Sequence, residues 1–225
     1  MAKRGDNSNY LYHWIKSDLS LNASLQDHYE SAFKTLLLIL GDLALKSGKA
    51  LGYRTGHSCI CFTETPVWFM SDDKSKYQPF GFEFNKRDIY KIGGEYVIYC
   101  SRESSKKLPQ EFMWKWMIHE PLSQTTQTPY GIDFTWEREV RVNSSRINFL
   151  GPSDIVDPSS LSNVMFAFTC IYVPSIYWKG RFLKEVDVLL HGWLSELKNE
   201  NDYYLYEIFY NEVIEELTRS IQILP

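Results

Sequence analysis

The hydrophobic pattern of this chain changes its period several times, and the order of these changes constrains the fold more than any single motif. Apolar alternation or short apolar runs predict strands, and apolar residues at helical spacing predict helices. The order strand, helix, several strands, helices is typical of an α+β fold, with a mixed or antiparallel sheet core and flanking helices. The expected strands are 9–15, 58–62, 80–86, 95–101, 135–142 and 164–173, and the expected helices are 25–46, 86–91, 110–118, 180–197 and 206–221.

Local signals fix several ends of these elements. Ser24 is a suitable N-cap for the first helix, and Gly48 is a natural stop for it. Gly93-Gly94 predicts a tight turn before a strand. The length of 225 residues fits one domain over 1–225, with a core at about 9–175 and a C-terminal helical pair at about 180–222.

Charge and cysteine usage narrow the class of protein. A net charge of −4 argues against a dedicated nucleic-acid-binding module, which depends on a basic surplus. The four cysteines form no Cys-x-x-Cys pair and lie in hydrophobic segments, so we expect buried, reduced thiols. Reduced thiols, the absence of an apolar segment after the first basic residues, and apolar runs too short to cross a bilayer predict a cytoplasmic protein without a membrane partner.

Several common site motifs are absent. The chain has no Gly-rich phosphate loop, no Gly-x-Ser-x-Gly elbow and no His-Glu-x-x-His zinc motif. The loop aspartates are isolated and are expected to be solvated surface groups. We therefore expect no metal.

The stretch Thr135–Val142, TWEREVRV, carries the most informative charges. In a strand it would place Glu137, Glu139 and Arg141 on one face. Such a face is either the solvated side of an antiparallel sheet or the wall of a site. His13, in a predicted strand, is likewise either a hydrogen-bonded core residue or a ligand group, and Glu64, beside a turn, is expected to be a cap or a surface acid.

Four short pieces carry polar groups in or beside predicted strands: YLYHWIK, SCICFTETP, YQPFGFEF with IGGEYVIY, and WEREVRV. Their order resembles that of the abortive-infection proteins of the AbiGi type, over about 13–142. More distantly the layout is similar to the ADP-ribosyltransferase superfamily, including the DarT-like DNA-modifying toxins. No clear Ser-Thr-Ser strand is present, and the tyrosine of the His-Tyr-Glu class has three candidates, Tyr53, Tyr77 and Tyr99.

The resemblance implies an ADP-ribosyltransferase-like fold with NAD as a substrate. His13, Thr63, Tyr77 and Arg141 would bind NAD, and Glu139 or Glu137 would be catalytic. A carboxylate stabilises the oxocarbenium-like centre formed when the N-glycosidic bond breaks, and a second one orients or deprotonates the nucleophile. Arg141 would contact a phosphate or hold Glu139 by an ion pair.

Three functions follow as expectations. The first is a phage-defence mono-ADP-ribosyltransferase that modifies a protein or nucleic-acid target. The second is a non-enzymatic antitoxin or interaction partner within a toxin–antitoxin or defence system. The third, ranked lower, is a metal-dependent nuclease that uses Glu64, Glu137 and Glu139.

Overall fold

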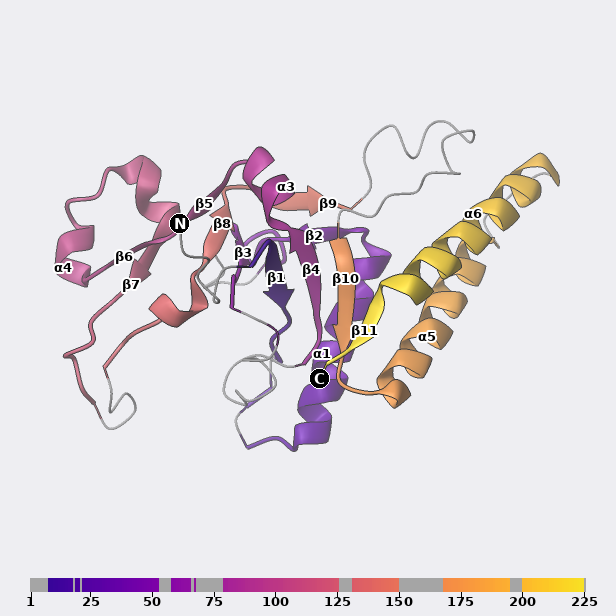
Figure 1. Cartoon of the computed structure of the whole chain (residues 1–225), viewed down its shortest axis with the longest axis horizontal. Coiled ribbons are helices and arrows are strands. Elements are labelled where there is room, and N and C mark those ends of the chain that lie inside the picture. Colours follow the sequence, from indigo (N-terminus) through magenta and orange to yellow (C-terminus); the bar gives the residue numbers. More distant parts are fainter. Residues whose placement is uncertain are drawn as a thin grey trace. The chain divides into compact units, whose positions relative to one another are not determined.

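The computed structural model describes residues 8–17, 19–20, 22–52, 58–65, 67, 79–125, 131–149, 168–194 and 200–224. These residues form a mixed α+β protein, which confirms the predicted class (Figure 1). The strands are β1 (Tyr10–Trp14), β2 (Ala44–Lys46), β3 (Ile60–Phe62), β4 (Gly81–Asn85), β5 (Gly94–Tyr96), β6 (Ile98–Cys100), β7 (Trp116–Ile118), β8 (Val140–Val142), β9 (Arg146–Asn148), β10 (Phe168–Val173) and β11 (Ile221–Ile223). The helices are α1 (Leu25–Gly41), α3 (Lys86–Lys91), α4 (Arg102–Ser105), α5 (Ile176–Leu194) and α6 (Glu200–Ser220), with 3₁₀ turns η1 (Gln110–Lys115) and η2 (Thr135–Glu137).

The chain forms two compact units, and each is assembled from three separate stretches of sequence. Unit 1 contains the described residues within Met1–His13, Lys46–Phe69 and Phe84–Ile147. Unit 2 contains those within Trp14–Leu45, Met70–Glu83 and Asn148–Pro225. The strand orders are β1-β4-β10-β11, β2-β9, β3-β8-β5 and β6-β7.

Unit 1 is organised around β8, the central strand of the antiparallel sheet β3-β8-β5. All three residues of β8 are buried. The register places Arg141 between Cys61 on β3 and Glu95 on β5. A second small sheet pairs β6 with β7 in parallel, with Ile98 opposite Trp116. A charged side chain, Arg141, therefore occupies the middle of the central strand and is buried there.

Unit 2 packs α1 and α5 together through aromatic rings. Ser24 caps α1 in a reciprocal capping box with Asp27, as its N-cap position predicts. The rings of Phe33 on α1 and Trp178 on α5 lie 5.0 Å apart. Arg181 adds an ion pair to Glu30 at 2.5 Å. These contacts join the first turns of α5 to α1.

The C-terminal part of unit 2 holds α5, α6 and β11. The two helices run side by side in Figure 1, and the Tyr210 hydroxyl donates a hydrogen bond to Asp187. Strand β11 pairs in parallel with β10, with Ile171 opposite Ile221. The sequence pattern missed β11, because it is three residues long and follows the helix directly. No helix among the residues described is both long and apolar enough to span a bilayer.

The predicted helix 25–46 is wrong over its last turn, because α1 ends at Gly41. Leu43 takes a positive φ of 47°, which is incompatible with continuing the helix. Its carbonyl instead accepts a hydrogen bond from the Phe149 N–H at 2.8 Å. Residues Ala44–Lys46 then form a strand rather than a helical turn.

Other differences lie in unit 1. The predicted strand 95–101 is interrupted at Val97, whose N–H donates to the Glu139 carbonyl at 3.0 Å. The predicted helix 110–118 is a 3₁₀ turn followed by β7. Short helix α3 and strand β4 occur as predicted. Of the predicted strand 164–173, residues 164–167 lie outside the described residues.

We expect two glycine substitutions to have opposite effects on stability. A Cβ on Gly94 would lie 2.8 Å from the Ile89 carbonyl oxygen, so Gly94→Ala should lower the free energy of unfolding by about 1–3 kcal/mol. A Cβ on Gly180, within α5, would meet nothing within 4 Å, so Gly180→Ala should raise it by about 0.5–1 kcal/mol. Urea unfolding of both variants measures this, and a Gly94→Ala protein as stable as the parent would contradict the packing described.

Candidate functional site

The prediction of one strand over Thr135–Val142 is wrong, since only Val140–Val142 is extended. Thr135 donates hydrogen bonds from its N–H and its hydroxyl to Asp133 Oδ1, at 2.8 and 2.6 Å. These bonds favour the 3₁₀ turn η2 over an extended strand. Arg138 follows with a left-handed backbone, φ 44° and ψ 52°. Glu137 and Glu139 therefore do not share a strand face.

Arg141 and Glu139 form a buried, two-point ion pair. Arg141 Nε lies 2.7 Å from Glu139 Oε1, and Nη2 lies 3.3 Å from Oε2. Burial lowers the pKa of Arg141, but the hydrogen bonds and charge of Glu139 outweigh it and raise that pKa. The ion-pair role expected of Arg141 is the one that the structure shows.

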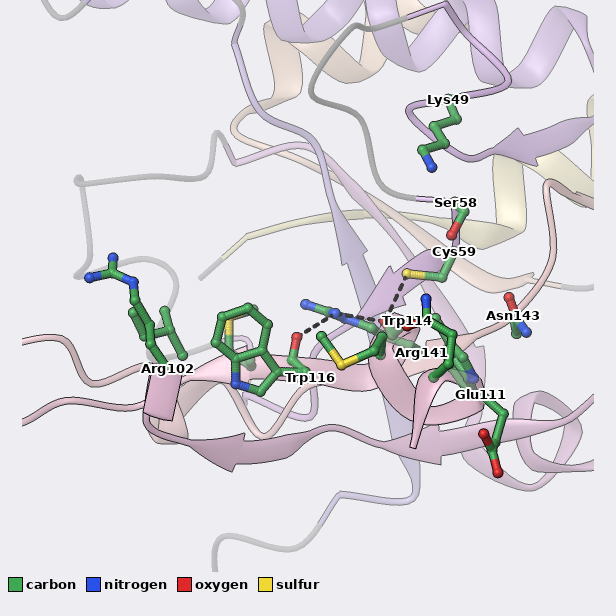
Figure 2. Close-up of a pocket in the computed structure, with 13 residues that line it drawn as sticks. Lys49, Ser58, Cys59, Arg102, Glu111, Trp114, Trp116, Arg141 and Asn143 are labelled. Atoms are coloured by element: carbon green, nitrogen blue, oxygen red, sulfur yellow. Dashed lines mark hydrogen bonds between the residues drawn. The ribbon is translucent and has the colours of Figure 1, made fainter. Parts of the chain in front are cut away.

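Two further bonds complete the surroundings of the guanidinium. Nη1 donates to the carbonyls of Trp114 at 2.8 Å and Trp116 at 3.0 Å (Figure 2). With the two bonds to Glu139, four of the five N–H donors of an arginine are used. Within the described residues, the second N–H of Nη2 has no acceptor.

Neither predicted catalytic glutamate is a solvated surface group. Glu137 is 1% exposed and Glu139 is 4% exposed. The Glu139 N–H donates to the Tyr99 hydroxyl at 2.9 Å. Burial raises the pKa of Tyr99 to about 12, so this phenol stays protonated at neutral pH. Of the two alternatives for this stretch, the solvated sheet face is therefore wrong for both side chains.

The residues predicted to bind NAD lie in different surroundings. His13 is half-buried, and its Nδ1 lies 2.8 Å from the Cys61 carbonyl oxygen. Thr63 is buried, and its hydroxyl donates to the Glu137 carbonyl. Tyr77 lies outside the described residues. The structure thus joins Thr63 to the backbone of Glu137 and joins Arg141 to the side chain of Glu139.

Glu64 is the centre of a second polar cluster in unit 1, which we call the Glu64 cluster. Its carboxylate is fully buried and accepts from Lys86 at 2.7 Å, from Tyr96 at 2.6 Å and from Arg138 at 2.9 Å. The expectation of a cap or surface acid is wrong. The ion pair with Glu64 links Arg138, in the turn before β8, to the segment that follows β3.

The geometry does not support the hypothesis of a metal-dependent nuclease. Glu64 and Glu139 are each held by cationic side chains of their own, Glu64 by Lys86 and Arg138, and Glu139 by Arg141. Among the residues that the structure describes, no group of three or more His, Cys, Asp and Glu side chains is arranged to hold a metal ion.

A pocket of about 750 Å³ opens in unit 1 along η1 and β7. Its walls include apolar side chains of one short stretch: Met113, Trp114, Trp116, Met117 and Ile118. Sequence reasoning did not find this pocket. The signal was the dense Trp and Met content of residues 113–117, which lie in the stretch whose secondary structure is hardest to predict.

Three cationic side chains also line the pocket, as Figure 2 shows: Lys49, Arg102 and Arg141. Arg141 is neutralised by Glu139. Within the described residues, the exposed Arg102 side chain pairs with Glu120 at 3.5 Å. Lys49 makes no ion pair within the described part of the chain. Glu111 is the one acidic residue among the described lining residues. Lys49 and Arg102 are therefore the charges available to an anion.

The Trp116 ring is held by its own hydrogen bond. Its indole N–H donates to the Cys100 carbonyl at 3.1 Å, across the β6-β7 pair. The Trp116 side chain is drawn among the lining residues in Figure 2. A fixed indole plane on a pocket wall is a suitable surface for stacking a planar group.

No protein-family model, no curated protein and no solved structure matches this chain.

We expect removal of Glu139 to destabilise unit 1 severely. Glu139→Ala leaves the guanidinium of Arg141 buried without its counter-charge, which costs about 3–5 kcal/mol. The matched control is Glu103→Ala, which breaks an exposed ion pair with Lys106 and should cost under about 1 kcal/mol. Urea unfolding compares the two variants, and equal losses would show that the Glu139–Arg141 pair is not the stabilising element described.

Proposed function

We propose that this chain binds a nucleotide in the pocket along η1 and β7, and that the nucleotide is NAD. The observation that carries the proposal is the combination, in one pocket, of the fixed Trp116 ring with two weakly paired cations, Lys49 and Arg102.

Size and chemistry support a nucleotide. A volume of about 750 Å³ falls in the range of small-molecule sites. An indole ring stacks on a planar base or nicotinamide, and such stacking contributes about 1–3 kcal/mol per base. Lys49 and Arg102 supply charge-assisted hydrogen bonds to phosphate oxygens. The apolar side chains of Met113 and Met117 cover the remaining wall.

Arg141 lies in the pocket wall with one N–H to spare. Glu139 and two carbonyl groups hold its guanidinium in place, so the remaining donor has a fixed direction. A donor that is already oriented loses little freedom when a ligand binds. In this arrangement Glu139 positions Arg141, because its own carboxylate faces the guanidinium.

We further propose transfer of ADP-ribose to a protein or nucleic-acid acceptor in phage defence. The support is the ordered resemblance of the four motifs, with NAD as the substrate it implies. Cleavage of the N-glycosidic bond needs a carboxylate near the reacting carbon. Glu111 is the acidic side chain on the described pocket wall, so we place it ahead of Glu137 and Glu139 for that role.

A second candidate is the non-enzymatic antitoxin or interaction partner. It is favoured by the burial of Glu137 and by the ion pair that occupies Glu139, since neither carboxylate lines the pocket. In this case the pocket binds a nucleotide without turning it over. Both candidate functions include binding of the nucleotide, but only the transferase also cleaves it.

The binding test is titration of the purified chain with NAD by calorimetry. We expect saturable binding, weakened about tenfold or more by Trp116→Leu, because a stacking surface is lost. Lys49→Gln should weaken it by a similar factor and reduce its salt dependence. The control, Arg87→Gln, removes an exposed cation that does not line the pocket and should bind NAD like the parent. Absence of saturable binding would refute the proposal.

The reaction test is incubation with labelled NAD and cell lysate. An enzyme should release nicotinamide and label an acceptor, and Glu111→Gln should lower that rate at least about tenfold. The control, Glu103→Gln, changes an exposed acid that does not line the pocket. NAD that is bound but not consumed would reject the transferase and favour the interaction partner.

A further inference from the structure

We propose that unit 1 binds a single-stranded nucleic acid on a second surface, made by α3, the end of β5 and the turn before β8. We call it the α3 surface, and it consists of two tyrosines and four cationic side chains: Tyr90, Tyr96, Lys86, Arg87, Lys91 and Arg138. None of the six is among the described residues that line the pocket. The strand is the candidate acceptor of the proposed transferase, and that role rests on the proposed function, whereas binding itself is measured without NAD.

Four of these residues lie on α3 (Figure 1). Residues three or four apart are neighbours on a helix surface, which places Lys86 beside Tyr90 and places Arg87 beside both Tyr90 and Lys91. Ile89 is the buried residue of α3, and it lies on the opposite side of the helix from Arg87 and Lys91. The cations and Tyr90 therefore share the solvent side of α3.

Two tyrosine rings supply planar apolar surface. Tyr90 is 37% exposed and Tyr96 is 42% exposed, and their ring centres lie 6.0 Å apart. The Tyr96 hydroxyl donates to Glu64 at 2.6 Å and accepts from Lys86 at 2.9 Å, so that ring is held in place. Bases of a single strand stack on such rings whatever their sequence, because every base has a planar face.

The Glu64 cluster contributes positive charge to this surface. The buried Glu64 carboxylate pairs with Lys86 at 2.7 Å and with Arg138 at 2.9 Å, so two positive charges share one negative charge. Both cationic side chains are about one-quarter exposed. Lys86 Nζ also lies 5.5 Å from the centre of the Tyr96 ring. A cation and a stacking surface thus occur at one place, as a strand of alternating phosphates and bases requires.

Helix α3 adds charge to the same surface. Arg87 is exposed and has no ion pair within the described residues. The acid of α3, Asp88, pairs with Lys91 at 2.8 Å, and Glu95 of β5 pairs with Lys115. The net charge of −4 argues against a module dedicated to nucleic acid, but a local cationic surface attracts phosphate within the range of charge screening.

A single strand suits this surface better than a duplex or an acidic protein. In a duplex the faces of the bases stack on one another, so the two tyrosine rings would have no base to contact. An acidic peptide would pair with the cations but carries no regular series of planar groups for the rings. The combination of exposed tyrosines with cations is the one that binds single strands without sequence preference.

The experiment follows the fluorescence anisotropy of a labelled mixed-sequence DNA strand of about 20 nucleotides as the full chain is added, at about 50 mM salt and without NAD. We expect saturable binding that weakens as salt rises, because cations on the protein displace counterions from phosphates. Tyr90→Leu should weaken binding at least about fivefold, since a stacking surface is lost. Arg87→Gln should weaken binding and reduce the slope of log K against log salt by about 0.7, the share of one phosphate contact.

Matched variants elsewhere on the chain are the controls. Tyr204→Leu changes a tyrosine of α6 that is 64% exposed, and Lys106→Gln changes an exposed cation that follows α4. Both should bind the strand like the parent. Trp116→Leu, which changes the pocket, should also bind the strand normally, and Arg87→Gln should keep its NAD binding. Strand binding and NAD binding are therefore lost in different variants.

Four results would overturn the proposal. The first is the absence of saturable binding of the single strand by the parent chain, and the second is equal affinity for the same strand annealed to its complement. The third is equal loss of binding in Tyr90→Leu and Tyr204→Leu. The fourth is binding of labelled poly-glutamate as tight as that of the strand, which would assign the α3 surface to an acidic protein.

Discussion

The buried guanidinium of Arg141 is the interaction on which unit 1 depends most. It lies on the central strand of the β3-β8-β5 sheet, where a charge is costly unless it is paired and hydrogen-bonded. Glu139 supplies the counter-charge, and the carbonyls of Trp114 and Trp116 fix the end of η1 and the start of β7. The same side chain therefore holds the pocket wall from the middle of the sheet, and Glu139 balances its charge there.

The Glu64 cluster plays a comparable part at the other end of β3. One carboxylate gathers Lys86 from α3, Tyr96 from β5 and Arg138 from the turn before β8. The two clusters explain why three short strands, each of three residues, hold a defined arrangement. Buried ion pairs of this kind add little net stability over an apolar core, but breaking one partner is expensive. The ion pairs of the two clusters determine which side chains contact one another, and therefore which residues line the pocket.

Features that depend on interactions between neighbouring residues in the sequence could be predicted, whereas features that depend on residues far apart in the sequence could not. Ser24 and Asp27 are three residues apart, so the start of α1 was correctly predicted. The prediction of a charged strand at 135–142 was wrong for two reasons. The hydrogen bonds of Thr135 to Asp133 favour a turn, and the ion-pair partner of Arg138 is Glu64, which is 74 residues away in sequence. The pocket was missed because η1 has neither the period of an α-helix nor that of a strand. Burial of Glu137 and Glu139 depends on partners that alternation does not reveal.

The central claim is that a planar, anionic ligand stacks on Trp116 in unit 1. The most direct measurement is ¹⁹F NMR of the fluorotryptophan-labelled chain during titration with NAD, with the Trp116 signal identified by its loss in Trp116→Phe. The account predicts a saturable shift of the Trp116 signal, while the signals of Trp14 and Trp178, which belong to unit 2, keep their positions. A Trp116 signal that stays in place at saturating NAD would contradict it.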